Sequence, residues 1–379
     1  MRTNILVIIS ALFLCITHGF ALPRFAALTG AKCQSCHVNP SGGEMRQAFG
    51  VQYGREQLPV PEWSKDYSLD DFSNLLGNVL GIGADFQTLY FSQKASSATT
   101  DAFFQMQGDL YLNFRVARKV NLFFNKGLYN GFEVFALLGI LPANGGVKVG
   151  KFVPAYGTKM DDHTTFIRTY TGFSPELARP ELTGVEVDVS PGPITVIGGV
   201  FNSSDGFGAA EGNDKAYLGR VEGMFGGDGA VHVGVGGNVW YNAAVPQSVL
   251  QRINLVAPVQ TSGSPRSTLY GGFGSLGIGK LAVLGEVDWM QLRSDLPTTK
   301  SFVCYVEGDY PLITGLDLKL AYDFYDPDIT YKNGSITRYT AGVEFFPFPG
   351  VEVRPLYRIL HGTNVDLQSE FDLLLHLYF

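Results

Sequence analysis

Most of the chain alternates between apolar and polar side chains with a period of two residues. Residues 316–325 show the pattern: Asp317, Lys319, Ala321, Asp323 and Tyr325 alternate with Leu316, Leu318, Leu320, Tyr322 and Phe324. Successive side chains of a β-strand point to opposite faces, so each such segment is predicted to be a strand. Similar segments recur from Gly81 onward, for example at 185–189, 338–345 and 351–359. The body of the chain is therefore predicted to be all-β and antiparallel.

Connection lengths indicate the kind of sheet, because a soluble β-sandwich also alternates. Tight turns are predicted at residues 117–119, 142–146, 190–193, 226–229, 279–280, 311–315 and 346–350. Longer polar connections lie between them, at residues 154–181, 202–214, 242–267, 293–299, 327–336 and 361–369. Short periplasmic turns that alternate with longer extracellular loops are typical of transmembrane β-barrels. We expect about 16 strands, an even number that puts both ends of the barrel on the periplasmic side.

The two ends of the chain indicate the same location. Residues 1–21 read as a secretory signal peptide, with Arg2, an apolar stretch at 5–16 and the small-x-small site Gly19-Phe20-Ala21. The apolar stretch is shorter than the roughly 20 residues that a membrane helix needs. Residues 371–379 alternate and end on Phe379, like the C-terminal strand signal of bacterial outer-membrane barrels. We expect the bacterial outer membrane, with the lipid bilayer as a partner and both termini periplasmic.

Composition agrees with a barrel, and the net charge argues against a nucleic-acid partner. The chain has 46 Gly, 28 Phe and 18 Tyr, and only 17% of its residues are charged. Charged side chains on one face of the strands suit the water-filled interior of a barrel of about 16 strands. The net charge of -7 argues against nucleic-acid binding.

Cys33, Cys36 and His37 form the pattern C-x-x-C-H. This is the attachment pattern of c-type haem: the two thiols form thioethers, and the histidine coordinates the iron. A thioredoxin-like redox pair is less favoured, because proline and glycine residues follow at 40–43 instead of a helix. A zinc site needs four ligands, and the chain has no second C-x-x-C. One covalently bound haem c is therefore predicted.

The haem segment is too small to fold alone. We divide the chain into a signal peptide (1–21), a monohaem segment (22–59), a linker (60–76) and the barrel (77–379). A segment of roughly 40 residues cannot bury a sufficient apolar core without a bound cofactor or a cross-link. We therefore expect the haem to form its core and the segment to plug the barrel. Met45 is the local candidate for the sixth iron ligand, which would raise the reduction potential. His232 and His376 are alternatives, because alternation places both on inward faces.

The sequence from Leu22 to His37, followed by Pro40 and Phe49-Gly50, resembles the fused monohaem cytochrome–porins of the bacterial outer membrane. These proteins are best known from iron-oxidising bacteria. The resemblance implies that Cys33 and Cys36 bind haem and that His37 is the axial ligand. It also implies that electrons pass from extracellular ferrous iron to a periplasmic carrier such as a soluble cytochrome c. Residues 41–46 depart from the segment expected in the iron-oxidising members.

Three functions remain open at this point. The first is an electron conduit, inward from an extracellular metal ion or outward to an extracellular acceptor. The second is a solute porin in which the haem segment is a structural or gating plug. A peroxidase-like enzyme is weaker, because no distal acid–base pair is found in the segment.

Acidic residues in the loops could gather cations. They are Asp161, Asp162, Asp205, Glu211, Asp214, Asp326 and Asp328. His163, beside Tyr156 and Lys159, adds an imidazole to the first two of these, which is a weak signal for a metal site.

Overall fold

A computed structural model describes most of the chain. The described residues are 23–30, 32–65, 74–77, 79–95, 98–128, 132–160, 162–173, 181–203, 214–227, 229–245, 265–294, 297–363 and 365–379. The predicted signal peptide and the acidic residues Asp161, Asp205 and Glu211 lie outside them.

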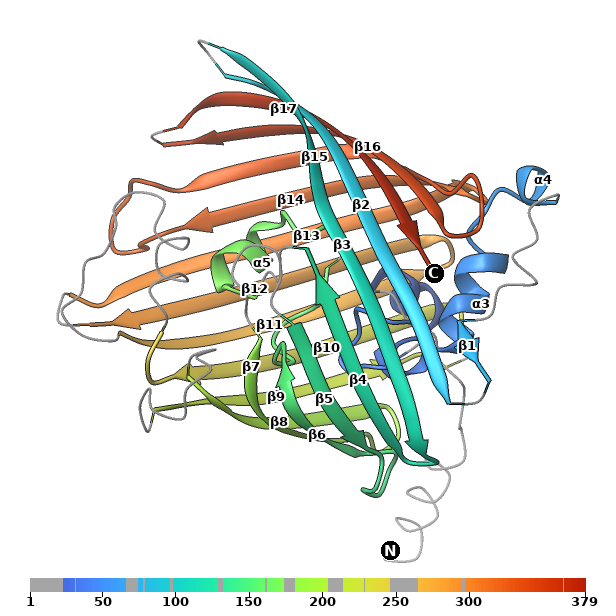
Figure 1. The fold of residues 1–379 in the computed structure, drawn as a ribbon. Helices are drawn as coiled ribbons and strands as arrows, with labels where there is room; N and C mark the ends of the chain where they lie inside the picture. Colours follow the sequence, from blue (N-terminus) through green and yellow to red (C-terminus); the bar gives the residue numbers. More distant parts are fainter. Residues whose placement is uncertain are drawn as a thin grey trace, which may run out of the picture.

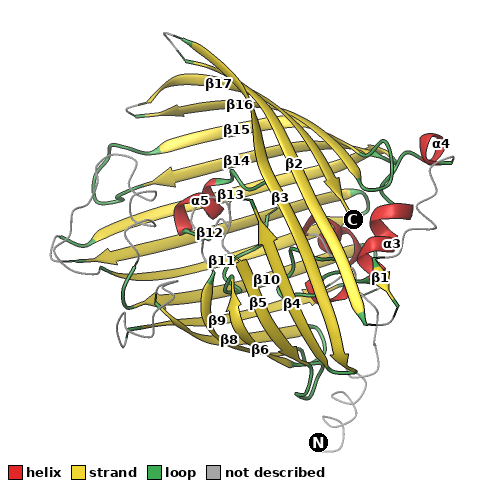
Figure 2. Cartoon of the chain, viewed as in Figure 1, coloured by secondary structure: helices red, strands yellow, loops and turns green. Residues whose placement is uncertain are grey.

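Sixteen antiparallel strands form a closed barrel (Figures 1 and 2). They are β2 (Leu80–Lys94), β3 (Thr99–Ala117), β4 (Val120–Gly127), β5 (Phe132–Leu138), β6 (Gly146–Phe152), β7 (Leu182–Val189), β8 (Ile194–Asn202), β9 (Lys215–Phe225), β10 (Val231–Asn242), β11 (Arg266–Ile278), β12 (Leu281–Arg293), β13 (Thr299–Ile313), β14 (Leu316–Asp326), β15 (Ile336–Phe345), β16 (Val351–Gly362) and β17 (Val365–Tyr378). Each strand pairs with the next, and β17 pairs with β2, with Tyr378 opposite Asp85. The predicted fold class and strand number are confirmed.

The tight turns lie at one rim of the barrel, which we call the turn rim. Residues 118–119, 190–193, 279–280 and 346–350 connect strands there, as predicted. The first strand begins and the last strand ends at this rim, where the amide of Ala84 donates to the carbonyl of Phe379. We call the opposite end the loop rim. The predicted long loop at 361–369 is wrong, because β16 runs to Gly362 and β17 begins at Val365.

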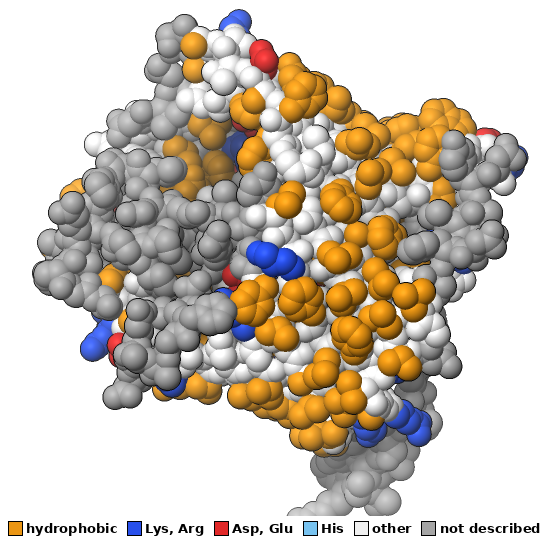
Figure 3. Space-filling view, viewed as in Figure 1, with side chains coloured by type: hydrophobic (Ala, Val, Ile, Leu, Met, Phe, Trp, Pro, Cys, Tyr) orange, Lys and Arg blue, Asp and Glu red, His pale blue; other side chains and the backbone are white. Residues whose placement is uncertain are grey.

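The barrel has an apolar outside and a largely polar inside. Along β10, Val231, Val233 and Val235 are exposed, whereas His232 and Asn238 are buried. Figure 3 shows apolar side chains spread over the outer face of the strands in view. This is the outward apolar band of a membrane barrel. Among the described helices, none is both long and apolar enough to cross a membrane.

Residues 23–58, which we call the plug, fill the lumen near the turn rim. The plug contains α2 (Pro23–Thr29), a 3₁₀ turn (Cys33–Ser35) and α3 (Ala48–Glu56). Helix α2 packs on β10, β11 and β12, and Arg24 pairs with Glu344 of β15. Lys32 donates to the carbonyl of Gly192 in the β7–β8 turn at 2.8 Å. These contacts hold the plug to strands on several sides of the barrel.

The chain leaves the lumen over the turn rim. The amide of Val60 donates to the carbonyl of Phe346 at 3.0 Å. Short helix α4 (Pro61–Ser64) follows, and its Trp63 ring lies 5.4 Å from the ring of Phe345. A two-residue strand β1 (Leu75–Leu76) then pairs with the start of β2. The predicted linker is described at residues 60–65 and 74–76.

A second insertion enters the lumen from the loop rim. Residues 153–173, which we call the inward loop, follow β6 and contain α5 (Phe166–Thr171), packed on β12, β13 and β14 (Figure 1). The hydroxyl of Tyr156 donates to Asp288 at 2.6 Å, and the amide of Phe166 donates to Asp323 at 2.8 Å. The long connection predicted at residues 154–181 is present between β6 and β7. Its described part folds inward and is largely buried, because carboxylates of the lumen accept its backbone amides.

An apolar core fills one side of the lumen between these two insertions. The rings of Phe123, Phe135 and Phe152 contact one another in sequence, with centroids 4.9 Å and 5.7 Å apart. Val38 and Met45 of the plug belong to the same cluster. Buried apolar area stabilises the docked plug by roughly 25 cal/mol per Å².

Candidate cofactor site

The C-x-x-C-H motif forms a compact turn inside the barrel. The amides of Cys36 and His37 both donate to the carbonyl of Cys33, at 3.2 Å and 3.1 Å. The chain then folds back, so that the amide of Val38 donates to the carbonyl of Met45 at 3.0 Å. Gly42 and Gly43 make this reversal with φ of 88° and 74°, a conformation that favours glycine.

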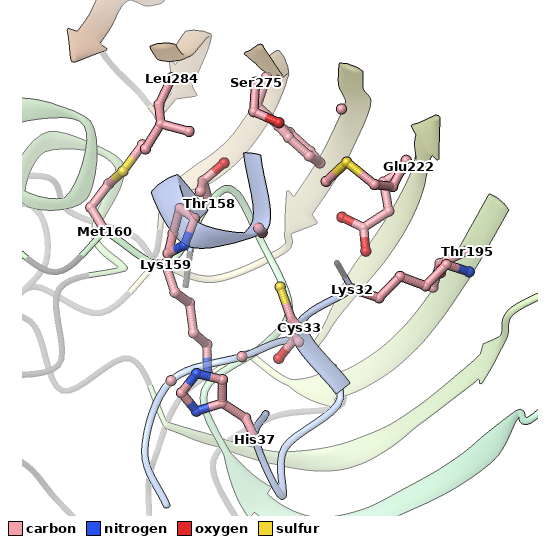
Figure 4. A pocket seen from close by; sticks show the side chains of 18 of the residues that line it. Lys32, Cys33, His37, Thr158, Lys159, Met160, Thr195, Glu222, Ser275 and Leu284 are labelled. Atoms are coloured by element: carbon pink, nitrogen blue, oxygen red, sulfur yellow. The ribbon is translucent and has the colours of Figure 1, made fainter. Parts of the chain in front are cut away.

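A large cavity separates the plug from the inward loop (Figure 4). It holds about 1210 Å³ of space that no atom fills, part of it open to solvent. Its lining comes from three parts of the fold: Cys33, His37 and Glu44 of the plug; Thr158, Lys159, Met160 and His163 of the inward loop; and wall residues that include Asp85, Arg220, Glu222 and Leu284.

His37 is a buried, neutral imidazole at the edge of this cavity. Its residue is 4% exposed, and no hydrogen-bond partner for Nδ1 is found among the described residues. Burial, helped by the positive charges of Arg46 and Lys159, lowers the pKa of His37 to about 4. A neutral imidazole is the form that binds a metal.

The two motif cysteines lie in different surroundings. Cys33 lines the cavity, and burial raises the pKa of its thiol to about 11. Cys36 is 4% exposed and packs against Ala26 and Phe49. Gly50 lies against the Cys36 backbone. A Cβ at position 50 would lie only 2.6 Å from the carbonyl oxygen of Cys36. The third described cysteine, Cys304, lies on β13 and does not line the cavity.

This arrangement fits a c-type haem better than the alternatives. The cavity places a thiol and a neutral imidazole at one wall, and the second thiol belongs to the same turn. Within the described ranges, no group of three or more His, Cys, Asp or Glu is placed to hold a metal ion, so a zinc site finds no support there. The turn leads into a glycine reversal and not directly into a helix, unlike a thioredoxin-like pair.

The structure does not bring the predicted sixth ligands to the cavity. Met45 is 2% exposed, and its Cε lies 2.5 Å from where a Cβ of Gly81 would stand. His376 lies between Glu352 and Asp85, at 2.8 Å and 3.0 Å. His232 contacts Gly30, and its Nε2 lies 3.0 Å from the carbonyl of Gly227. Met45 as a ligand stays a prediction.

The inward loop carries charged groups that form ion pairs inside the barrel. Lys159 pairs with Glu44 of the plug at 3.1 Å. Burial alone would raise the pKa of the Glu44 carboxyl, but Lys159 and neighbouring groups hold it below its usual value. Asp162, predicted as a cation-gathering loop residue, is a buried partner of Arg358 at 2.6 Å. No sequence signal marks these pairs, because their members are far apart in the chain.

Comparisons with known proteins support the fold. Neither a protein-family model nor a curated protein sequence matches the chain. Among solved structures, the anion-selective porin from Comamonas acidovorans superposes with a TM-score of 0.58 at 12% identity, covering 79% of this chain and 99% of that one. The loop-L8 deletion mutant of the outer membrane protein OmpT of Vibrio cholerae gives 0.56 at 17% identity, covering 79% and 99%. Salmonella typhi OmpF gives 0.56 at 10% identity, covering 79% and 97%. The chain therefore has the fold of outer-membrane porins.

Proposed function

We propose that this protein is an outer-membrane electron conduit with one c-type haem held inside the barrel. Electrons would pass from an extracellular donor, with ferrous iron favoured by the sequence resemblance, to a periplasmic carrier such as a soluble cytochrome c. In this proposal the turn rim and both termini face the periplasm, as the short turns of outer-membrane barrels do.

One observation carries this proposal. The C-x-x-C-H turn lies within the lumen and lines a cavity enclosed by the plug, the inward loop and the wall. In that place, the barrel wall would shield a redox group from the lipid.

The residues around the cavity have separate roles in this proposal. Cys33 and Cys36 would hold the haem covalently, and His37 would bind its iron. The bound haem supplies a one-electron carrier. The plug contacts, such as Arg24 with Glu344 and Lys32 with Gly192, keep that carrier at a fixed height in the barrel. The inward loop closes the other side of the cavity.

A solute porin is the alternative. Porins of this strand number leave an aqueous channel. Here the plug, the inward loop and the apolar core occupy much of the lumen. We therefore expect reconstituted protein in planar bilayers to conduct ions far less than an unplugged barrel of the same strand number.

The first experiment tests the cofactor. Protein from cells that make c-type cytochromes is denatured, separated by electrophoresis and stained for covalent haem. The double variant of Cys33→Ala and Cys36→Ala is expected to lose the stain. Cys304→Ala is the matched control, since it removes the third described cysteine from β13, away from the cavity. Stain retained in the double variant would reject the proposed site.

The second experiment tests the direction of transfer. Intact, oxygen-free cells are mixed with ferrous iron, and the reduced-haem absorption band is followed. Rapid appearance of the band in the wild type, and its absence in the double variant, would support an inward conduit. Reduction by a periplasmic donor alone would exclude iron oxidation and favour outward transfer.

A further inference from the structure

We propose that Lys159 of the inward loop raises the reduction potential of the haem bound at His37, so that a segment entering from the loop rim tunes the redox group of the plug. This inference deepens the function proposed above and rests on it.

The first step is the position of the Lys159 side chain. In Figure 4 it runs from the inward loop toward the His37 ring, and both residues line the cavity. Its Cδ lies 2.9 Å from where a Cβ of Gly43 would stand, so it passes directly over the glycine reversal of the plug. Its Nζ lies 3.1 Å from the Glu44 carboxylate. The charge is therefore delivered beside the imidazole that would bind the iron.

The second step is that this position is fixed. The amide of Thr158, next in the chain, donates to Glu286 at 2.7 Å. Arg220 donates to the carbonyl of Ala155 at 3.2 Å, and Asp162 pairs with Arg358 at 2.6 Å. The inward loop is thus held to the wall on both sides of Lys159. These contacts fix the backbone from which the Lys159 side chain extends.

The third step is electrostatic. The Lys159 side chain is 15% exposed, so solvent screens its charge far less than it screens an exposed ion. Reduction adds one electron to the iron, and a nearby positive charge stabilises the reduced form relative to the oxidised one.

Other charges around the cavity set the background for this effect. Lys32, Arg46 and Arg220 are positive, and Glu44, Asp85 and Glu222 are negative. Lys32 is held by backbone carbonyls of the β7–β8 turn, and Arg220 by Glu222 and the inward loop. Lys159 differs from these groups because it reaches across from the inward loop to the plug.

The test is a potentiometric titration of the haem-loaded protein, followed by absorption. Lys159→Met keeps the length of the side chain and removes its charge. It is expected to weaken electron binding at least tenfold, which is a fall of about 59 mV for a one-electron couple. Lys159→Arg should keep the wild-type potential, and Glu44→Gln should shift it upward. Lys151→Met is the control, because Lys151 lies on β6 over the Phe132 ring and does not line the cavity.

Each outcome decides the matter. An unchanged potential in Lys159→Met, or a fall of equal size in Lys151→Met, would overturn the inference. A change of iron spin state in Lys159→Met would overturn it too, because Lys159 would then be a ligand and not a nearby charge. Absence of covalent haem from the wild type would instead defeat the proposed function itself.

Discussion

Lys159 and Glu44 form an ion pair of 3.1 Å between residues 115 positions apart in the chain. One partner belongs to a loop that enters from the loop rim, and the other belongs to the plug near the turn rim. Their meeting closes the cavity that holds Cys33 and His37 at its wall. The two insertions therefore act as one unit inside the barrel. Substitutions in either one should alter the geometry of the cavity.

The plug depends on a buried ion pair with the wall. Arg24 is 5% exposed, pairs with Glu344 and lies 4.0 Å from Asp309. Breaking a buried pair typically costs about 3–5 kcal/mol. Glu344 keeps Lys319 at 3.2 Å, which points to the lower end of that range. Arg24→Met should therefore increase the population of undocked plug by roughly two orders of magnitude.

Trypsin cleavage of the plug in protein reconstituted into vesicles measures this change. Arg55→Met is the control, because Arg55 forms an exposed pair with Glu56 worth about 0–1 kcal/mol. Equal cleavage rates for the two variants would contradict the predicted role of Arg24.

A glycine of the wall makes room for the first plug helix. A Cβ on Gly277 of β11 would clash with the carbonyl oxygen of Ala27 in α2. Overpacking of this kind costs about 1–3 kcal/mol. Gly277→Ala is expected to leave the barrel folded, displace the plug and raise the single-channel conductance. Gly198→Ala is the matched change on β8, where nothing lies within 4 Å of the new methyl group. The same conductance in both variants would disprove this account.

The inward loop should stay docked in mild acid. Burial alone would raise the pKa of the Asp162 carboxyl, but Arg358, Arg338 and Arg354 hold it far below its ordinary value of 3.8. The folded pKa is thus lower than the unfolded one. The stabilisation is present above about pH 3.8 and is lost only as the pH falls below that value toward the folded pKa.

Hydrogen exchange of the α5 amides tests this prediction. Protection of α5 should not change between pH 7 and pH 5 once the intrinsic exchange rate is corrected. Asp162→Asn should lose protection of the α5 amides at both pH 7 and pH 5, because breaking the buried pair destabilises the docked loop by about 3–5 kcal/mol. A wild-type loop that opens between pH 7 and pH 5 would show that another group controls it.

Met45 can be tested separately as an iron ligand. It packs on Gly81 and Gly83 of β2, outside the cavity lining. Met45→Leu nearly conserves volume, so it should cost less than about 1.5 kcal/mol. If Met45 only packs there, the absorption spectrum of the oxidised haem-loaded protein will be the same in Met45→Leu as in the wild type. Loss of a sulfur-to-iron band in Met45→Leu would establish Met45 as the sixth ligand.

Local patterns were enough to predict most of the barrel. A period of two residues identifies a strand, and a short Gly-Lys pair such as Gly279-Lys280 identifies a hairpin turn. The prediction failed at residues 361–369, where Gln368 reads as a loop residue. Gln368 belongs to β17. The inward face of this barrel is polar, so its side chains resemble those of a loop. The C-x-x-C-H motif was equally local, since its meaning depends on spacing within five residues.

Only the tertiary structure decided what surrounds that motif. Barrel closure brings β2 against β17 and carries the inward loop over the plug, so that Lys159 meets Glu44 and Asp162 meets Arg358. The same closure places Met45 against β2 and His376 between two carboxylates. Alternation specifies which face of a strand a residue occupies. It does not specify how high along the barrel axis that residue lies, or which path a loop takes. Contacts across the lumen depend on both, and both are set only when the sheet closes.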